Sequence, residues 1–423
     1  RELTQAEITR MFNTYYSPNR VANGNFSQIG NEEVSNGDFS QIGSEQVTNG
    51  DFATDSDWNK LNGSTISGGV GNVIANGDIG ITGANWSLSQ DVGMILGKTY
   101  KISFSARQTG GTGNLQVAQA FLKGFNQSIT SSFADYSFYI TALNYSGNTG
   151  KISIGGNING DTFEVDNISV KEVGQDWTFG TGWGMGDGKA VRVASSSTDL
   201  VQASVFPNLT SIFKISFDVV RSAGSVRLRA GTLNLPYVSA TDTYTYYVTP
   251  TSNDQLKFQA DSSFVGSIDN ITVKEVGQHW IFGTGWSTDG TKAIYTAGGA
   301  QFAQLEQIQG LNSGATYKVL FDLVDTDSLG VYVRLNAGSW SPLITGTGSK
   351  ELSSVAGSGN QIEFEIGGHY DTKSLSIDNI VIQELKHDAT NLMINHSEYQ
   401  SANPLITSTK SMEFDGSDDY LQL

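Results

Sequence analysis

The most constraining feature of this chain is an eighteen-residue passage that occurs twice. Residues 166–183 and 269–286 are identical at fifteen of eighteen positions, and both begin Asp-Asn-Ile and end Phe-Gly-Thr-Gly-Trp. A looser copy of the first half begins at Asp378. The Asp-Asn pairs lie 103 residues (166 to 269) and 109 residues (269 to 378) apart, which is the length of one small β domain. The passage therefore predicts a joint, in which the last strand of one domain leads directly into the first strand of the next.

Composition and alternation indicate an all-β chain. Its 423 residues include 49 glycines and 6 prolines, as expected for many tight turns. In residues 213–217 (Phe-Lys-Ile-Ser-Phe) apolar and polar side chains alternate, which is typical of a strand with one face in a core and one in water. We expect three tandem β-sandwiches of jelly-roll type, over residues 46–173, 174–276 and 277–385.

Each Asp-Asn pair is expected to mark a β-bulge. Ile268 and Ile271 are three residues apart, whereas Ile271 and Val273 are two apart. All three can face one core only if the strand gains a residue between them. Asp and Asn are residue types that tolerate the backbone angles that such a bulge requires.

The chain before the first sandwich has two parts. Thr4 and Glu7 form a capping box, followed by an apolar stripe at helical spacing, so one short N-terminal helix is predicted within residues 1–20. Residues 21–52 contain three copies of a 13-residue repeat built on Asn-Gly-Asn/Asp-Phe. We interpret residues 21–45 as a linker that can add short strands to a neighbour's edge, and the third copy as the start of the first sandwich.

Charge and composition exclude several function classes. The net charge is -17 with only 25 Lys plus Arg and no basic cluster, so we expect no nucleic-acid partner. No apolar run approaches the ~20 residues that span a bilayer, so no membrane insertion is expected. With no Cys, neither disulfides nor thiol chemistry can contribute. The chain opens at Arg1 without a signal peptide, and we interpret it as a piece of a longer polypeptide.

We do not expect an enzyme. The four His residues lack metal-ligand spacing, and no nucleophile elbow or phosphate loop is present. Paired catalytic carboxylates need no motif and could occur among the 42 acidic residues, but they usually occupy a cleft larger than a small sandwich offers.

Several motifs carry a family resemblance. Asn-Gly-Asp-Phe at 49–52 with Trp58, the Gly-Lys-Thr-Tyr-Lys-Ile-Ser-Phe strand at 97–104 and the closing Ile-Asp-Asn-Ile strands resemble carbohydrate-binding-module jelly rolls over residues 46–385. Residues 1–20 resemble the end, and residues 386–423 the beginning, of laminin-G/concanavalin-A-like sandwiches. The whole mosaic resembles tail-fibre and appendage proteins of marine bacteriophages.

The resemblance implies a structural Ca²⁺ between the sheets, held by an Asp near each closing strand. By position these are Asp166, Asp269 and Asp378. The alternative is that each Asp-Asn pair only shapes the bulge and hydrogen-bonds its own backbone. Both interpretations remain open at this point.

Sugar binding requires exposed aromatic rings beside polar groups, because C–H faces stack on rings while hydroxyls need partners. Strand alternation places one Tyr or Arg set on the outer face of each sandwich, although exposed Tyr is also common in cross-strand packing. The candidates are Tyr139 in the first sandwich, Tyr247, Arg227 and Arg229 in the second, and Tyr332, Arg334 and Trp340 in the third.

These patterns lead to one main hypothesis and two alternatives. The main hypothesis is a non-catalytic segment of a virion appendage or extracellular adhesin that binds surface glycans and contacts other fibre subunits. The alternatives are a purely structural spacer, or an accessory region of a polysaccharide depolymerase. Degeneration of the aromatic strand in the third sandwich (residues 350–354) favours the spacer.

Overall fold

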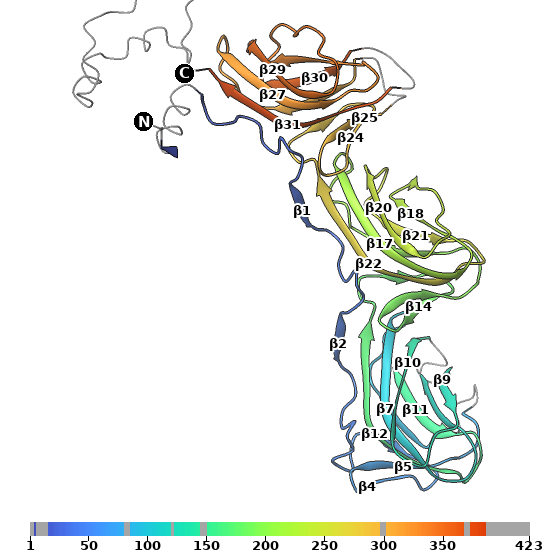
Figure 1. Ribbon diagram of the computed structural model, residues 1–423. Helices are drawn as coiled ribbons and strands as arrows, with labels where there is room; N and C mark the ends of the chain where they lie inside the picture. Colours follow the sequence, from blue (N-terminus) through green and yellow to red (C-terminus); the bar gives the residue numbers. More distant parts are fainter. Residues whose placement is uncertain are drawn as a thin grey trace, which may run out of the picture. The chain divides into compact units, whose positions relative to one another are not determined.

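The structure is a computed structural model, and its described residues are all-β. They comprise residues 4–5, 16–79, 85–119, 122–143, 150–296, 302–367 and 373–385. Every secondary-structure element named among them is a strand, and the strands pair in antiparallel sheets (Figure 1), which confirms the all-β part of the predicted fold class. The predicted helix falls mostly, and the segment 386–423 wholly, outside the described residues. No helix in the described part of the chain is long and apolar enough to cross a membrane.

The strands form six sheets that face one another in three pairs, here called sandwiches 1, 2 and 3. Sandwich 1 contains β2 (Ile42–Glu45), β3 (Asn59–Lys60), β4 (Thr65–Ser67), β5 (Val70–Ile74), β6 (Leu88–Asp91), β7 (Thr99–Gly110), β8 (Leu115–Gln119), β9 (Leu122–Gln127), β10 (Ala134–Thr141), β11 (Lys151–Gly156) and β12 (Thr162–Val173). Sandwich 2 contains β1 (Ile29–Glu32), β13 (Thr178–Phe179), β14 (Trp183–Gly186), β15 (Lys189–Arg192), β16 (Asp199–Gln202), β17 (Ile212–Ala223), β18 (Val226–Ala230), β19 (Leu233–Asn234), β20 (Asp242–Val248), β21 (Leu256–Ala260) and β22 (Val265–Val276). Sandwich 3 contains β23 (Ile281–Phe282), β24 (Trp286–Thr288), β25 (Ala293–Tyr295), β26 (Gln304–Ile308), β27 (Thr316–Val324), β28 (Val331–Leu335), β29 (Gly348–Val355), β30 (Gln361–Ile366) and β31 (Leu375–Glu384).

Each sandwich has a closing sheet, which contains the Asp-Asn strand, and a second sheet. Written from the same edge, the closing sheets run β4-β5-β12-β7-β10, β14-β15-β22-β17-β20 and β24-β25-β31-β27-β29. The second sheets run β3-β6-β11-β8-β9, β13-β16-β21-β18-β19 and β23-β26-β30-β28. The matching orders show that one strand plan is used three times.

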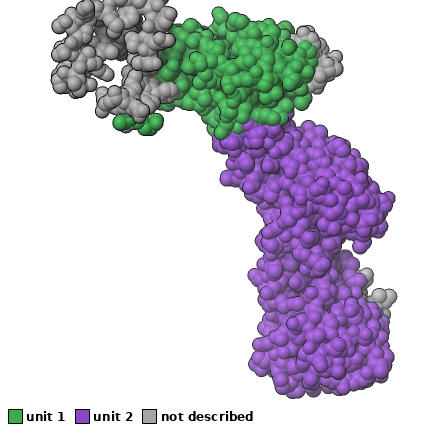
Figure 2. Space-filling view, in the orientation of Figure 1, with its two compact units in different colours: residues 1–25, 279–286, 292–423 green, residues 26–278, 287–291 purple. Residues whose placement is uncertain are grey.

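The chain divides into two compact units, coloured separately in Figure 2. Unit 2 comprises residues 26–278 and 287–291 and includes sandwiches 1 and 2. Unit 1 comprises residues 1–25, 279–286 and 292–423 and includes most of sandwich 3.

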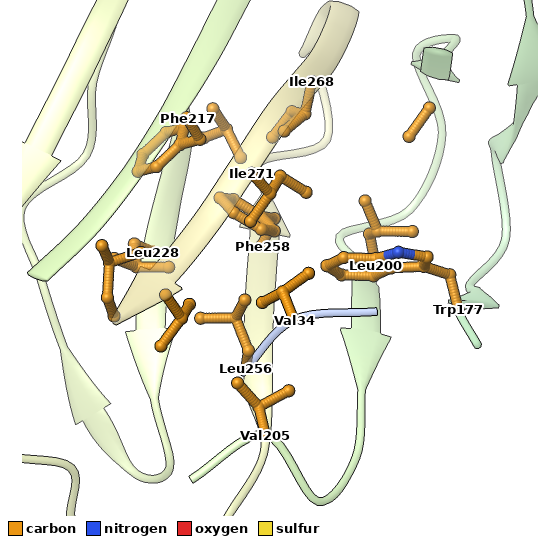
Figure 3. Packing of buried hydrophobic residues seen from close by; sticks show 14 of the residues in the cluster. Val34, Trp177, Leu200, Val205, Phe217, Leu228, Leu256, Phe258, Ile268 and Ile271 are labelled. Atoms are coloured by element: carbon orange, nitrogen blue, oxygen red, sulfur yellow. The ribbon is translucent and has the colours of Figure 1, made fainter. Parts of the chain in front are cut away.

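Apolar side chains that alternate along the strands fill the space between the paired sheets. Figure 3 shows this for sandwich 2, where Phe217, Leu228 and Phe258 meet. In every sandwich one edge-to-face Phe pair joins the two sheets. The pairs are Phe104–Phe125 at 5.2 Å, Phe217–Phe258 at 4.8 Å and Phe321–Phe364 at 5.3 Å between ring centroids. The tryptophans of the repeated passage are also buried, at Trp177, Trp183, Trp280 and Trp286.

The predicted bulges are confirmed in all three closing strands. The pairing with β7, β17 or β27 shifts register at each Asp-Asn pair. Asn167, Asn270 and Asn379 take the left-handed conformation, with φ of 50°, 52° and 52°. The shift allows Ile268, Ile271 and Val273 to be buried together, as their spacing required.

The segment before sandwich 1 adds strands to the closing sheets instead of running free. β1 pairs with β22, and β2 pairs with β12 (Figure 1). In unit 1, the Ser17 amide donates to the Glu384 carbonyl at 3.0 Å. Residues 21–45, for which we predicted a linker that can add edge strands, therefore belong to the sheets that they border.

Candidate glycan-binding faces

In sandwich 2 the two predicted arginines lie on the outer face of the second sheet. They alternate along β18 with buried Val226 and Leu228. Arg227 stacks on Tyr237, with the guanidinium carbon 4.7 Å from the ring centroid, and its Nε donates to Gln259 at 2.8 Å. The Tyr237 side chain is 44% exposed. This ring is therefore held in place by a neighbouring cation while remaining open to solvent.

Arg229 occupies the next outward position on β18. Its guanidinium lies 3.6 Å from the Asp199 carboxylate on β16. Lys257 on β21 pairs with Arg229 in register, so three basic side chains, counting Arg227, share this face. The outer face of sandwich 2 therefore combines one exposed ring with a local positive charge.

In sandwich 3 the structure brings all three predicted residues together. The Arg334 guanidinium carbon lies 4.2 Å from the Trp340 ring centroid, and Tyr332 meets Trp340 edge to face at 6.5 Å. Arg334 also donates from Nε to Glu363 at 2.7 Å. The hydrogen bonds to Glu363 favour the protonated guanidinium and so raise the pKa of Arg334 above its ordinary value.

The two faces occupy equivalent positions but carry opposite charge. Positions 105 residues apart correspond, so Arg227 matches Tyr332 and Arg229 matches Arg334. Around Arg334, however, the neighbouring strands supply Glu306, Glu363 and Glu365. Burial first, and then the charge of Glu363, raises the pKa of Glu306, which indicates crowding of carboxylates on this face.

Sandwich 1 differs, because a loop covers its second sheet. Ile79 is fully buried and its amide donates to the Gln116 side chain at 2.8 Å. Ser89 and Ser153, which point away from the core, are also fully buried. One ring with a cation remains at the margin, where the Lys151 ammonium lies 4.5 Å from the Trp86 centroid.

The predicted tyrosines of the closing sheets lie at joints. The Tyr139 hydroxyl accepts a hydrogen bond from the Gly188 amide at 3.2 Å, and the ring packs against the core of sandwich 2. Tyr247 is the matching residue of sandwich 2, and its ring lies 3.6 Å from the position of a Cβ at Gly290 in the same unit. Both side chains are half-buried and separate from the arginine-bearing faces.

The three aspartates expected to bind Ca²⁺ hydrogen-bond their own bulges. In each case Oδ1 accepts the amide of the following Asn, at 2.7 Å for Asp166, 2.9 Å for Asp269 and 2.7 Å for Asp378. Asp269 also lies 3.6 Å from the Lys189 ammonium. Within the described residues, no group of three or more His, Cys, Asp or Glu could hold a metal ion. Ca²⁺ prefers six to eight oxygen ligands, and these carboxylates do not converge on such a set.

Two residues of these faces were missed by the sequence reasoning, namely Tyr237 and Trp86. Tyr237 follows Pro236 in the connection after β18, just as Trp340 follows β28. The available signal was the position of Trp340, which corresponds to the connection that holds Tyr237. Applying the three-sandwich alignment to connections as well as strands would have found it.

Comparisons with known proteins give only distant similarities. No protein-family model and no curated protein matches the chain. Among solved structures it is similar to a CBM4 module, with 20% identity over 33% of this chain and 99% of that one and a TM-score of 0.21. It is also similar to the CBM22-1–CBM22-2 tandem of Paenibacillus barcinonensis Xyn10C (9% identity, 81% and 98% coverage, TM-score 0.24). A third similarity is to the triple-jelly-roll turret protein of an archaeal virus (12% identity, 78% and 89% coverage, TM-score 0.20). TM-scores this low do not extend any of these proteins' functions to the present chain.

Proposed function

We propose that this chain is a non-catalytic segment of a virion appendage or extracellular adhesin that binds surface glycans through the second sheets of sandwiches 2 and 3. One observation carries the proposal. On the outer face of two equivalent strands, β18 and β28, an arginine stacks on an aromatic ring: Arg227 lies 4.7 Å from Tyr237, and Arg334 lies 4.2 Å from Trp340. A ring held in this way loses little conformational freedom when a sugar stacks on it.

The surrounding charges suggest that the two faces take different sugars. The face around Tyr237 carries Arg227, Arg229 and Lys257, which suits uronic, sulfated or other acidic residues. The face around Trp340 carries Glu306 and Glu365 beside the buried, Arg334-bound Glu363, which suits neutral sugars whose hydroxyls donate to carboxylates.

A second candidate function, a structural spacer, has its own support in unit 2. The outer sheet face of sandwich 1 is covered by Ile79, and Tyr139 is committed to the joint with sandwich 2. Sandwich 1 is therefore assigned the spacer role in this proposal, and it would hold the neighbouring binding faces in place within a larger fibre.

The decisive experiment is a glycan array with the whole chain, read with and without a Ca²⁺ chelator. We expect binding to acidic glycans that Tyr237→Ala lowers by about tenfold, and binding to neutral glycans that Trp340→Ala lowers by about tenfold. Loss of binding with chelator would support the calcium sites that the sequence resemblance implies at Asp166, Asp269 and Asp378.

The matched control is Phe133→Ala. Phe133 is 42% exposed and has the Arg107 guanidinium carbon 5.0 Å from its ring centroid, but it lies outside both proposed faces. It should leave binding unchanged. If the folded chain binds no glycan, or if Phe133→Ala acts like the other two variants, the spacer function replaces the proposal.

A further inference from the structure

The N-terminal repeats are distributed over the three sandwiches in reverse order. The structure extends each repeat to an eight-residue strap motif, Asn/Glu-x-Val-x-Asn-Gly-Asn/Asp-Phe, whose copies start at Asn19, Glu32 and Glu45. The third copy contacts sandwich 1, which follows it directly in the chain. The second contacts sandwich 2 and the first contacts sandwich 3, across sequence separations of up to 241 and 363 residues between hydrogen-bonded partners.

In sandwich 2, one set of polar contacts holds the main chain and the first side chain of the motif. Val273 N donates to the Glu32 side chain, Oε1, at 2.6 Å. Gln202 forms a reciprocal pair with the Ser35 main chain: Ser35 N donates to Gln202 Oε1 at 3.0 Å, and Gln202 Nε2 donates to Ser35 O at 2.8 Å. Trp177 Nε1 donates to Asn36 O at 3.1 Å, and Ile271 N donates to Gly37 O at 2.9 Å. Gln202 and Trp177 are both buried. These two side chains therefore have their polar atoms satisfied by the strap motif and not by solvent.

The other sandwiches repeat the contacts to the main chain of the motif atom for atom. The reciprocal glutamine is Gln90 with Thr48 in sandwich 1 and Gln307 with Ala22 in sandwich 3, at 2.8–3.0 Å. The tryptophan donor is Trp58 to Asn49 O and Trp280 to Asn23 O, each at 3.0 Å. The bulge amide is Ile168 to Gly50 O and Ile380 to Gly24 O, each at 2.9 Å.

Three motif positions, the Gly, the Val and the Phe, are fixed by sterics or apolar burial. A Cβ at Gly24, Gly37 or Gly50 would overlap a bulge carbonyl oxygen, so only Gly allows this approach. The motif Val is part of the core, as Figure 3 shows for Val34 beside Leu200 and Leu256. Phe39 and Phe52 are buried against Trp177 and Trp58, with ring centroids 5.4 and 5.2 Å apart.

The first position of the motif distinguishes the first copy from the other two at a contact with the sandwich. Glu32 pairs in register with Lys274, and Glu45 with Lys171, whose ammonium lies 3.9 Å from the carboxylate. The first copy begins with Asn19 instead, and the residue of β31 that corresponds to these lysines is Gln383. Charge is thus matched in two pairs and absent from the third.

We propose that sandwiches 2 and 3 are acceptor sites for an extended peptide that carries the strap motif, and that this peptide need not belong to the same chain. Neither sandwich begins with a motif of its own, as sandwich 1 does, so each is completed by a segment from far away in the sequence. Identical contacts make the second and third copies interchangeable. The first copy would place Asn19, and not a carboxylate, opposite Lys274 of sandwich 2, so its binding there is disfavoured. This opposes a shift of the strap by one 13-residue repeat. This inference does not depend on glycan binding.

The test uses the whole chain with Gly37→Val, which expels the second copy from its site. The probe is a fluorescein-labelled synthetic peptide of residues 31–41, followed by anisotropy. We expect one peptide to bind per variant chain, at least about tenfold more tightly than to the unmodified chain, whose acceptor is occupied. A peptide of residues 44–54 should bind within about threefold of the first, whereas a peptide of residues 18–28 should bind more weakly.

The matched controls distinguish binding of the peptide at the acceptor site from nonspecific binding of the peptide to the chain. The probe with Val in place of its central Gly, and the chain with Gln202→Leu added, should each lose binding by about tenfold. Equal binding of the probe to the modified and unmodified chains would overturn the proposal, as would no binding to a folded Gly37→Val chain. If that variant does not fold, Val34→Ala is used instead, because it weakens the resident copy without a steric clash. The added peptide should then displace that copy and restore amide-exchange protection at Ile271 and Val273, and failure to do so would also overturn the proposal.

Discussion

The Tyr139 hydroxyl accepts a hydrogen bond from the Gly188 amide at 3.2 Å, and this contact joins the Tyr-rich strand of sandwich 1 to the β14–β15 hairpin of sandwich 2. Gly188 has a φ of 73°, so the hairpin turn uses a conformation that glycine adopts at little cost. Tyr139, which strand alternation places on the outer face of sandwich 1, therefore contacts sandwich 2 within unit 2.

Removing only this hydroxyl should weaken the joint. Tyr139→Phe is expected to lower the free energy of unfolding by about 1 kcal/mol, the typical net value of one hydrogen bond, and to leave glycan binding unchanged. Urea unfolding of the whole chain measures it. Tyr237→Phe, which removes an exposed hydroxyl, is the control and should change stability by less than about 0.5 kcal/mol. Loss of glycan binding in Tyr139→Phe would argue for a site at the joint.

Gly37 should tolerate no side chain. Gly37→Ala places a Cβ against the Ile271 carbonyl oxygen, so either the strap or the bulge must move, and we expect a loss of about 3 kcal/mol or more. Gly184→Ala is the matched control in the same sandwich, because a Cβ there meets nothing within 4 Å. Similar unfolding midpoints for the two variants would contradict the docking of the strap described above.

Acid should destabilise sandwich 2 through Asp218 and Asp261. Hydrogen bonds from Asn270 and Thr243 lower the pKa of Asp218, and for Asp261 the hydrogen bonds from Ser225 and Ser263 outweigh the opposing effect of burial. A folded-state pKa below the ordinary value of 3.8 means that the ionised forms add stability above that pH. This stability is lost as the pH falls through the folded-state pKa values.

The corresponding measurement is the urea midpoint between about pH 6 and pH 2, compared with the Asp218→Asn/Asp261→Asn double variant. The double variant should show a shallower decline below about pH 4, because two of the protonating groups are gone. An equally steep decline in both proteins would show that other carboxylates dominate the acid response.

Replacing Arg192 with lysine should destabilise the protein. Its guanidinium is buried, where it donates to Phe264 O at 3.1 Å and Ser196 O at 2.7 Å, and burial lowers its pKa. Lysine cannot reach two divergent carbonyls with one ammonium, so Arg192→Lys is expected to cost about 2 kcal/mol in chemical unfolding. Arg221→Lys, at a partly exposed arginine that donates to Ser239, should cost less than about 1 kcal/mol, and equal losses would refute the distinction.

Strand periodicity predicted the parts of the fold that depend on local pattern. The alternation in β17 and β18 placed Phe217 and Leu228 in the core and Arg227 outside it, because a pleated strand turns successive side chains to opposite faces. The spacing of Ile268, Ile271 and Val273 predicted the bulge for the same reason. The same alternation continued past Arg334 would place Asn336 on the outer face, but Asn336 is buried and its Nδ2 donates to Leu311 O. β28 ends at Leu335, and the alternation ends with it.

In the candidate sites too, contacts between residues close in sequence could be predicted, and contacts between distant strands could not. Arg334, Tyr332 and Trp340 could be grouped from sequence because they lie within nine residues of one another on a strand and its following turn. Glu363, which fixes Arg334, comes from β30 and could not be inferred without the strand order. Tyr139 was misjudged as open to solvent because the neighbouring hairpin that covers it is about fifty residues further along the chain.

The sequence by itself determined the repeated strand plan, the bulges and the core faces, since each depends on the period of two and on residue types that are adjacent in the chain. It also showed a 13-residue repeat and placed the third copy at the start of the first sandwich, but it did not show which sandwiches the first two copies would join. Only the tertiary structure decided that the copies dock in reverse order. The physical reason is that the partners of each motif, a buried glutamine, a tryptophan and a bulge amide, are assembled from separate strands and exist as one site only after the sheets have paired.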